Sequence, residues 1–118
     1  PLLEACTSDE RIVDLTGRTT VGTLMATIEA SVFVLANDSA ALHMAVGFHR
    51  PMVGLFGPTR IDRVGPYRHD ADVIQPQEPK PGVTHKTESD ARAMMARIEV
   101  RDVIKAIHQR LASSEAHA

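Results

Sequence analysis

The chain has 118 residues, of which 43% are apolar, 24% charged and 3% aromatic, and its formal net charge is −2. This length predicts one ordinary domain over residues 1–118, with a core of modest size. The near-neutral charge excludes the broad basic surface that nucleic-acid binding requires, and no apolar run reaches the roughly 18 residues of a membrane span.

The single cysteine, Cys6, excludes an internal disulfide and any multi-cysteine metal site, and it fits a reducing compartment. The first residues, Pro1 to Glu4, carry neither an initiator Met nor a signal-peptide pattern. We therefore expect the chain to be a truncated part of a longer polypeptide.

The first third of the chain predicts a strand and then a helix. Ile12–Leu15 is a short apolar run closed by Thr16 and Gly17, which is typical of a strand that enters a loop. A helix follows, with Thr19 or Thr20 as its cap, because apolar residues recur at helical spacing at Val21, Leu24, Met25 and Ile28.

The next segment predicts a strand, a turn and a short helix. Val32–Ala36 is apolar at every position, which is typical of a strand covered on both faces in a parallel sheet. It ends in Asn37–Ser39, which are favourable helix caps. A mostly buried helix is expected from Ala40 to Val46, stopped by Gly47.

A further buried strand is expected at Met52–Phe56, and it leads into the turn Gly57–Thr59. Gly and Pro are concentrated from there on, so residues 57–88 should be rich in loops, apart from a short strand near Val73–Ile74. C-terminal helices are expected over about residues 90–112: a shorter one over 90–98, then one on which Val100, Val103, Ile104, Ile107 and Leu111 recur.

This alternation of strands and helices predicts an α/β fold with a doubly wound parallel sheet and flanking helices. Such sheets bind ligands beyond the carboxyl ends of their strands. Function is therefore expected on the three loops that lie there, at Thr16–Thr20, Asn37–His43 and Gly57–Tyr67.

The turn from Asp38 to Ala41 has the chemistry of an anion site. A strand passes into a helix there, so backbone amides lie free at the positive end of the helix dipole. Such amides are suited to bind a phosphate group. Ser39 adds a hydroxyl, and His43 lies one turn further on the same row. The alternative is that Asp38 or Ser39 only caps the helix and that His43 is a hydrogen-bonded core residue.

The turn Gly57–Thr59 aims a hydroxyl and backbone amides into the same crevice, or is an ordinary strand-to-loop turn. Nearby arginines either meet phosphate or are solvated: Arg18, Arg60, Arg63 and Arg68.

The sequence lacks the residues that several other kinds of site would need. There is no complete glycine-rich dinucleotide fingerprint, no P-loop with its Lys and no pair of His at metal spacing, so we expect no metal and no bound cofactor. Ser39 lies between Asp38 and Ala40 rather than between glycines, which disfavours a hydrolase nucleophile. Cys6 is expected to be a spectator thiol.

Read together, the loops resemble successive motifs of the heptosyltransferase family, glycosyltransferase family 9. The resemblance lies in Leu15–Thr20, Asn37–His43 and Pro51–Thr59, in the same order and spacing, and it continues less specifically towards Leu111. It implies the later part of the C-terminal, donor-binding half of a GT-B enzyme. Members transfer heptose from ADP-heptose to the inner core of lipopolysaccharide, with inversion and without a metal.

Carried onto this sequence, the resemblance implies that Asp38 contacts the heptose and that Ser39, with the backbone of Ala40 and Ala41, holds the diphosphate. His43 would support that loop or the phosphate. The remaining donor-binding residues would be Thr16, Gly17, Arg18 and Thr19, which border the adenosine, and Gly57, Pro58 and Thr59.

The resemblance also places the general base and the lipid-linked saccharide acceptor site in an N-terminal half, so no catalytic residue is expected within this chain. The chain alone should bind donor poorly and should not turn over. The whole enzyme would act in the cytoplasm, at the inner face of the inner membrane, as a peripheral protein at most, with no nucleic-acid partner.

Two departures from the family motivate an alternative function. Ala40 stands where the family usually has Gly, and Ala does not freely take positive φ. The segment from Pro76 to Ser89 lacks the cysteines of many members. The alternative is a non-catalytic nucleotide-binding or interaction module with the same fold, and a third reading is an unrelated α/β domain whose loops match by accident.

Overall fold

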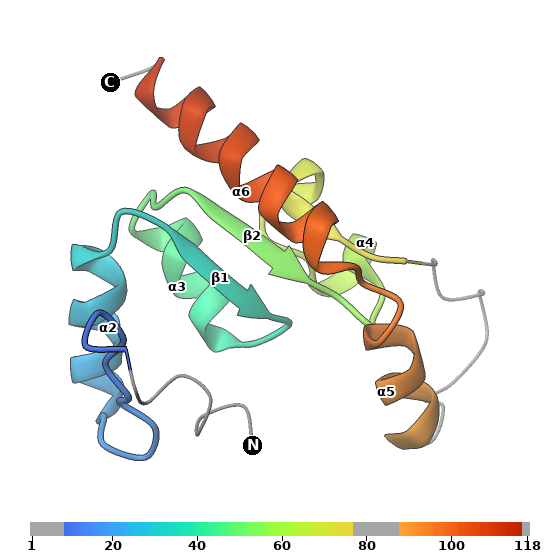
Figure 1. Ribbon diagram of the computed structural model, residues 1–118, viewed down its shortest axis with the longest axis horizontal. Coiled ribbons are helices and arrows are strands. Elements are labelled where there is room, and N and C mark those ends of the chain that lie inside the picture. The colour runs from blue at the N-terminus through green and yellow to red at the C-terminus, as the bar shows by residue number, and fades with distance from the viewer. Residues whose placement is uncertain (1–8, 77–87, 117–118) are drawn as a thin grey trace.

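The computed structural model describes residues 9–76 and 88–116 and shows a parallel sheet with helices on both faces (Figure 1). In this part of the chain the strands are β1 (Val34–Asn37), β2 (Met52–Leu55) and β3 (Val73–Ile74), in the order β1-β2-β3. Both pairings are parallel. The predicted class, an α/β fold with a Rossmann-like parallel sheet and flanking helices, is confirmed.

The helices form a layer on each face of this sheet. Helices α2 (Val21–Ala30) and α3 (Ala40–Gly47) lie side by side on one face, and α6 (Val100–Glu115) crosses the other face over β2 (Figure 1). Helix α3 connects β1 to β2 as a parallel crossover. Three shorter helical segments complete the described residues: α4 (Ile61–Val64), the 3-10 helix η1 (Asp70–Asp72) and α5 (Glu88–Met95).

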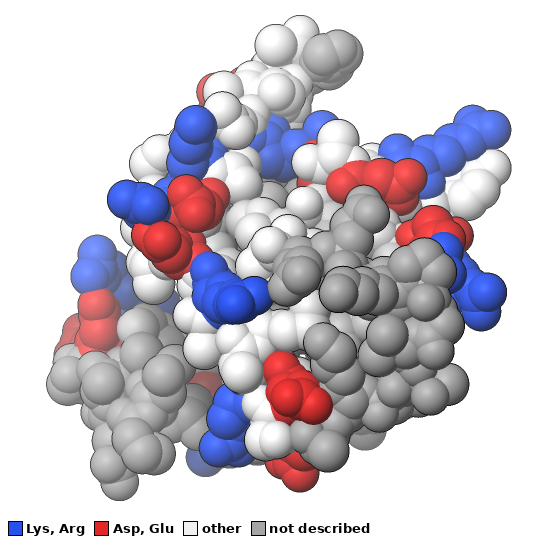
Figure 2. Space-filling model, turned by 90° about the vertical axis from the view of Figure 1, so that its right-hand side faces the viewer, with Lys and Arg blue, Asp and Glu red and all other residues white. Residues whose placement is uncertain are grey.

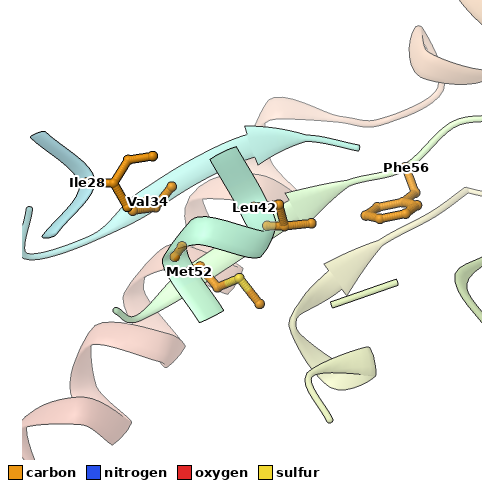
Figure 3. Close-up of a cluster of buried hydrophobic side chains, with 6 residues drawn as sticks. Ile28, Val34, Leu42, Met52 and Phe56 are labelled. Carbon is orange, nitrogen blue, oxygen red and sulfur yellow. The ribbon is translucent and has the colours of Figure 1, made fainter. Parts of the chain in front are cut away.

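The core lies between α2, α3 and the strand pair β1 and β2 (Figure 3). Leu42 of α3 is fully buried above Gly54 of β2, and a Cβ built on Gly54 would lie 2.9 Å from Leu42 Cδ2. The missing side chain therefore lets α3 lie close to the sheet. The buried cluster consists of Ile28, Val34, Leu42, Ala45, Met52 and Phe56.

Backbone pairing continues past the ends of the strands. Asn37 lies opposite Leu55, and the next amide, Asp38 N, donates to the Leu55 carbonyl at 3.2 Å. Beyond β2, Phe56 N donates to the Ile74 carbonyl at 3.0 Å. The segments that leave β1 and β2 are thus tied to the neighbouring strand, which holds the loops that follow at one edge of the sheet.

The prediction of a strand at Ile12–Leu15 is wrong, because this segment has no regular secondary structure. Its Val13 is 74% exposed, and the Thr16 amide donates to Asp14 Oδ1 at 2.9 Å in a tight turn. A strand needs a neighbour that takes up its backbone groups, and no strand of the described residues pairs with this segment. A short apolar run alone did not distinguish the two outcomes.

The run Val32–Ala36 forms a strand that is covered on one face only. Val34 is buried in the core, whereas Leu35, which points to the opposite face, is 48% exposed and Val32 is 82% exposed. The reason is that α6 packs over β2 and leaves β1 uncovered on that face. The prediction that Val32–Ala36 is covered on both faces is wrong, whereas β2, predicted as a buried strand, is buried at Met52, Val53 and Gly54.

The remaining elements follow the sequence prediction with shifted ends. Thr20 is the cap of α2, α3 includes Gly47, and α5 and α6 cover residues 88–95 and 100–115. The loop-rich segment is described to residue 76; residues 77–87 and Cys6 lie outside the described residues. None of the helices in residues 9–76 and 88–116 has both the length and the apolar character of a bilayer crossing.

Leu42→Ala should destabilise the fold by about 2–5 kcal/mol, because it leaves a cavity against Gly54 in the centre of the core. Urea unfolding followed by circular dichroism measures this loss. Val32→Ala, at a side chain that is 82% exposed, is the control and should stay within about 0.5 kcal/mol of the parent. Equal losses in the two variants would contradict this location of the core.

Candidate functional site

The loops that follow β1 and β2 lie next to each other. Asn37 and Leu55 are paired at the ends of these parallel strands, and the Asp38 amide bonds the Leu55 carbonyl. The first loop passes at once into α3, and the second begins at Gly57. The structure therefore brings together two of the three loops that the sequence singled out.

The start of α3 has no side-chain cap. Its N-cap residue is Ser39, with extended backbone angles of φ −157° and ψ 168°, and the Ser39 hydroxyl donates instead to the Asn37 carbonyl at 3.1 Å. In α2, by contrast, Thr20 Oγ1 accepts the Thr23 amide at 3.1 Å. Ser39 is therefore the N-cap by position, but its side chain bonds no amide of the helix, so the amides of Ala40 and Ala41 stay available to another acceptor.

The side chains around this helix start are open to solvent. Asp38, Ser39, Ala40 and His43 are exposed, and Ala41 is half-buried. Within the described residues, no hydrogen-bond partner is recorded for the Asp38 carboxylate or the His43 ring. The alternative reading of His43 as a core histidine is therefore wrong.

Ala40 needs no special backbone conformation. It is the first residue of α3, and among the described non-glycine residues positive φ occurs at His49 and Arg68. The helix can begin at this position without the conformational freedom of glycine. The departure from the family at residue 40 thus leaves the geometry of the turn intact.

The turn after β2 is clamped from two sides. Gln75 Nε2 donates to the Gly57 carbonyl at 2.6 Å and to the Thr59 carbonyl at 2.8 Å. Gly57 itself is buried, and a Cβ built on it would lie 3.2 Å from Met95 Sδ of α5. The turn is therefore held by its backbone, while Pro58 and Thr59 are half-buried.

Gln75 is a residue that the sequence did not single out. Its signal was a polar side chain directly after the short strand Val73–Ile74, at the edge where the loops gather. A single Gln after a strand is common, and only the structure shows that its carboxamide crosses to the neighbouring loop.

The remaining loop, Thr16–Thr20, leads into the start of α2, which packs beside α3 (Figure 1). Gly17 has φ +68°, a conformation that favours glycine, and Arg18 is exposed. Hydrogen bonding from Thr16, first by its side chain and then by its amide, lowers the pKa of the Asp14 carboxyl. Among the described residues no backbone hydrogen bond joins this loop to Asp38 or Gly57.

Two of the arginines have a charged or an aromatic neighbour: Arg60, within the second loop, and Arg68, just after it. Arg60 forms an ion pair with Asp62, with Nε 2.9 Å from Oδ1, and this bond lowers the pKa of Asp62. The Arg68 guanidinium lies 5.1 Å from the centre of the Tyr67 ring. Figure 2 shows blue and red side chains interspersed on this side of the molecule, so the face in view has mixed charge rather than one basic patch.

In the part of the chain that the structure describes, no group of three His, Cys, Asp or Glu side chains is arranged as metal ligands would be. The loops therefore offer backbone amides and the Ser39 hydroxyl as hydrogen-bond donors, and the neighbouring Asp38 carboxylate as an acceptor.

The turn between Asp14 and Thr16 should depend on pH. Since the folded pKa of Asp14 is lowered, the turn is complete above the ordinary carboxyl range of about pH 4 and is lost as the pH falls through the lowered pKa. An NMR titration of the Asp14 carboxyl carbon and the Thr16 amide measures both changes. Asp14→Asn, which keeps an acceptor oxygen but cannot ionise, should remove the pH dependence. A chemical shift of the Thr16 amide that does not change as the parent is acidified would contradict the assignment.

The model of glycosyltransferase family 9 (heptosyltransferase) matches residues 3–93. The chain is 36% identical over 62 residues to lipopolysaccharide heptosyltransferase 2 of Escherichia coli (strain K12), which covers 52% of this chain and 18% of that protein.

Two further relatives match to a similar extent. Lipopolysaccharide heptosyltransferase 2 of Salmonella typhimurium is 36% identical over 62 residues, covering 52% of this chain and 18% of that protein. Lipooligosaccharide heptosyltransferase 2 of Haemophilus influenzae is 32% identical over 66 residues, covering 56% of this chain and 19% of that protein. The matched region is thus about a fifth of each relative's length.

No solved structure matches the chain at a significant level. The family match spans most of the sequence, including all three loops, so the reading of an unrelated domain with accidental loop similarity is wrong. The chain belongs to glycosyltransferase family 9, the heptosyltransferase family.

Proposed function

We propose that residues 1–118 form the donor-binding part of a glycosyltransferase that transfers a heptose, or a related sugar, from ADP-heptose to the inner core of lipopolysaccharide. The observation that carries this proposal is the uncapped, exposed start of α3, held beside the turn after β2, within a chain of family 9. A helix start with free amides is suited to the diphosphate of a nucleotide sugar.

The diphosphate lies against the amides of Ala40 and Ala41 and the Ser39 hydroxyl. When the glycosidic bond breaks, negative charge grows on the leaving diphosphate. Amides that already point at it at the positive end of a helix dipole stabilise this charge without reorganisation and without a cation. This stabilisation would serve the leaving diphosphate in place of a metal ion, and the proposed inversion would follow from attack by the acceptor on the opposite face of the sugar.

Asp38 and His43 flank the diphosphate. The Asp38 carboxylate accepts hydrogen bonds from heptose hydroxyls, for which its exposure and lack of a recorded protein partner leave it available. His43 lies one helical turn after Ser39 and supports the loop or donates to a phosphate oxygen.

The other two loops complete the donor site. Thr16, Gly17, Arg18 and Thr19 border the adenosine, and the turn Gly57, Pro58 and Thr59 forms the wall on the side of β2. Support for the second assignment is the pairing of β1 with β2, which makes the two turns neighbours.

The remaining parts of the reaction belong to the rest of the polypeptide. The general base and the lipid-linked saccharide acceptor are assigned to an N-terminal half, so this chain alone binds donor weakly and does not turn over. The whole enzyme works in the cytoplasm, where the acceptor is presented at the inner face of the inner membrane, with which it associates peripherally. It uses no cofactor and no nucleic-acid partner.

The test uses the full polypeptide that the gene encodes, with ADP and ADP-heptose as ligands. ADP at about 100 times its Kd should raise Tm by roughly 5–10 °C, because it adds about 2.7 kcal/mol to the folded state. Asp38→Ala should lower sugar transfer by about a hundredfold or more. Ser39→Ala should lower it by about 10- to 100-fold, because the hydroxyl, which donates to the Asn37 carbonyl in the chain without ligand, is proposed to donate to the charged diphosphate when the donor binds.

The matched control is Asp70→Ala, at an exposed aspartate of η1 away from the helix start, which should transfer sugar at the parent rate. An Asp38→Ala variant as active as the parent would overturn the site. Tight ADP binding without transfer to any lipopolysaccharide acceptor would favour the alternative, a non-catalytic nucleotide-binding or interaction module.

A further inference from the structure

The side chain of Gln75 spans from the end of β3 to the turn after β2. Its Nε2 atom lies 2.6 Å from the Gly57 carbonyl oxygen and 2.8 Å from the Thr59 carbonyl oxygen, although these residues are 18 and 16 positions away in sequence. The side chain is half-buried. The distance to the Thr59 oxygen lies within the usual range of N–H···O hydrogen bonds, and the distance to the Gly57 oxygen is slightly shorter.

One nitrogen satisfies both carbonyls. A carboxamide NH2 has two protons, and here each carbonyl of the turn accepts one of them. The negative ends of these two peptide dipoles are therefore directed at Gln75. An anion beside the turn then meets less repulsion from backbone oxygens than it would if these carbonyls faced it.

Gln75 is the last of a series of links across the strand ends. Asp38 N bonds the Leu55 carbonyl, Phe56 N bonds the Ile74 carbonyl, and the next residue after Ile74 supplies the clamp on Gly57. The series connects the start of α3 through β2 to β3. Movement of the turn would therefore alter the position of the loop after β2 relative to the loop at Asp38.

The opposite side of the turn is closed by α5. Gly57 is buried against Met95, whose Sδ would lie 3.2 Å from a Cβ at residue 57, and the Ala91 carbonyl would lie at 3.8 Å. Gln75 supplies polar contacts on one side and α5 supplies van der Waals contacts on the other. The polar contacts are the ones that fix the direction of the carbonyls.

We propose that Gln75 is a positioning residue of the donor site, which orients the turn Gly57–Thr59 for an anionic nucleotide ligand without contacting it. The inference rests on the proposed function, because it assumes that the ligand beside this turn is a nucleoside diphosphate. It assigns to β3 a role in ligand binding through the turn.

The experiment compares Gln75→Met and Gln75→Glu in the full polypeptide, with ADP as the probe. Met keeps the length of the side chain and removes both donors, and Glu keeps the shape but places an ionised carboxylate against two carbonyls. Gln109→Met, at an exposed position of α6, is the matched control. Backbone hydrogen exchange at the amides of Gly57, Thr59 and Arg60 reports the turn, and calorimetry reports the Kd for ADP.

Gln75→Met should raise exchange at the turn several-fold and the Kd for ADP about tenfold, with β2 still protected. At pH 8, Gln75→Glu should raise the Kd for ADP more than Gln75→Met does. Near pH 5 the Kd of Gln75→Glu should approach that of Gln75→Met, because a protonated carboxyl again offers a donor. Each Kd is taken relative to the parent at the same pH. A loss of packing alone would not produce this pH profile.

Unchanged exchange in Gln75→Met overturns the clamp. Raised exchange with an unchanged Kd for ADP overturns the positioning role while leaving the clamp. If the parent polypeptide binds no ADP, the proposed function fails together with the ligand part of this inference, and the exchange result alone then reports on the clamp.

Discussion

Leu42 occupies the space in which a side chain at residue 54 would lie, and this contact sets how closely α3 approaches the strand pair. Because α3 begins directly after β1, the depth of this packing also fixes where its first amides lie relative to the turn after β2. A larger residue at 54 would lift the helix from β2. The relative position of these two loops thus depends on an apolar contact on the face of the sheet that α2 and α3 cover.

The segment from Val21 to Phe56 was predictable because its local patterns and its tertiary environment agree. Apolar residues at helical spacing gave α2, and the apolar runs before Asn37 and after Pro51 gave β1 and β2. Ile12–Leu15 has a comparable run without a strand beside it, so the same pattern produced no strand. Periodicity reports which residues prefer burial, whereas pairing depends on what lies next to them.

The candidate site divides in the same way. Asp38, Ser39 and His43 could be found because a strand-to-helix turn with small and polar residues has a recognisable sequence, and its openness to solvent removed the competing reading of a core histidine. Gln75 could not be found, because its importance comes from contacts with residues 57 and 59, which a local pattern does not contain.

The outer edge of β1 is an unusual feature for a strand that reads as a continuous apolar run. Within residues 9–76 and 88–116 it pairs on one side only, and Leu35 and Val32 lie open beside it. A bare edge with apolar neighbours is a template for adding another strand. At high concentration we therefore expect copies of the chain to associate edge to edge, and Leu35→Lys should oppose this association by placing a charge beside the open edge.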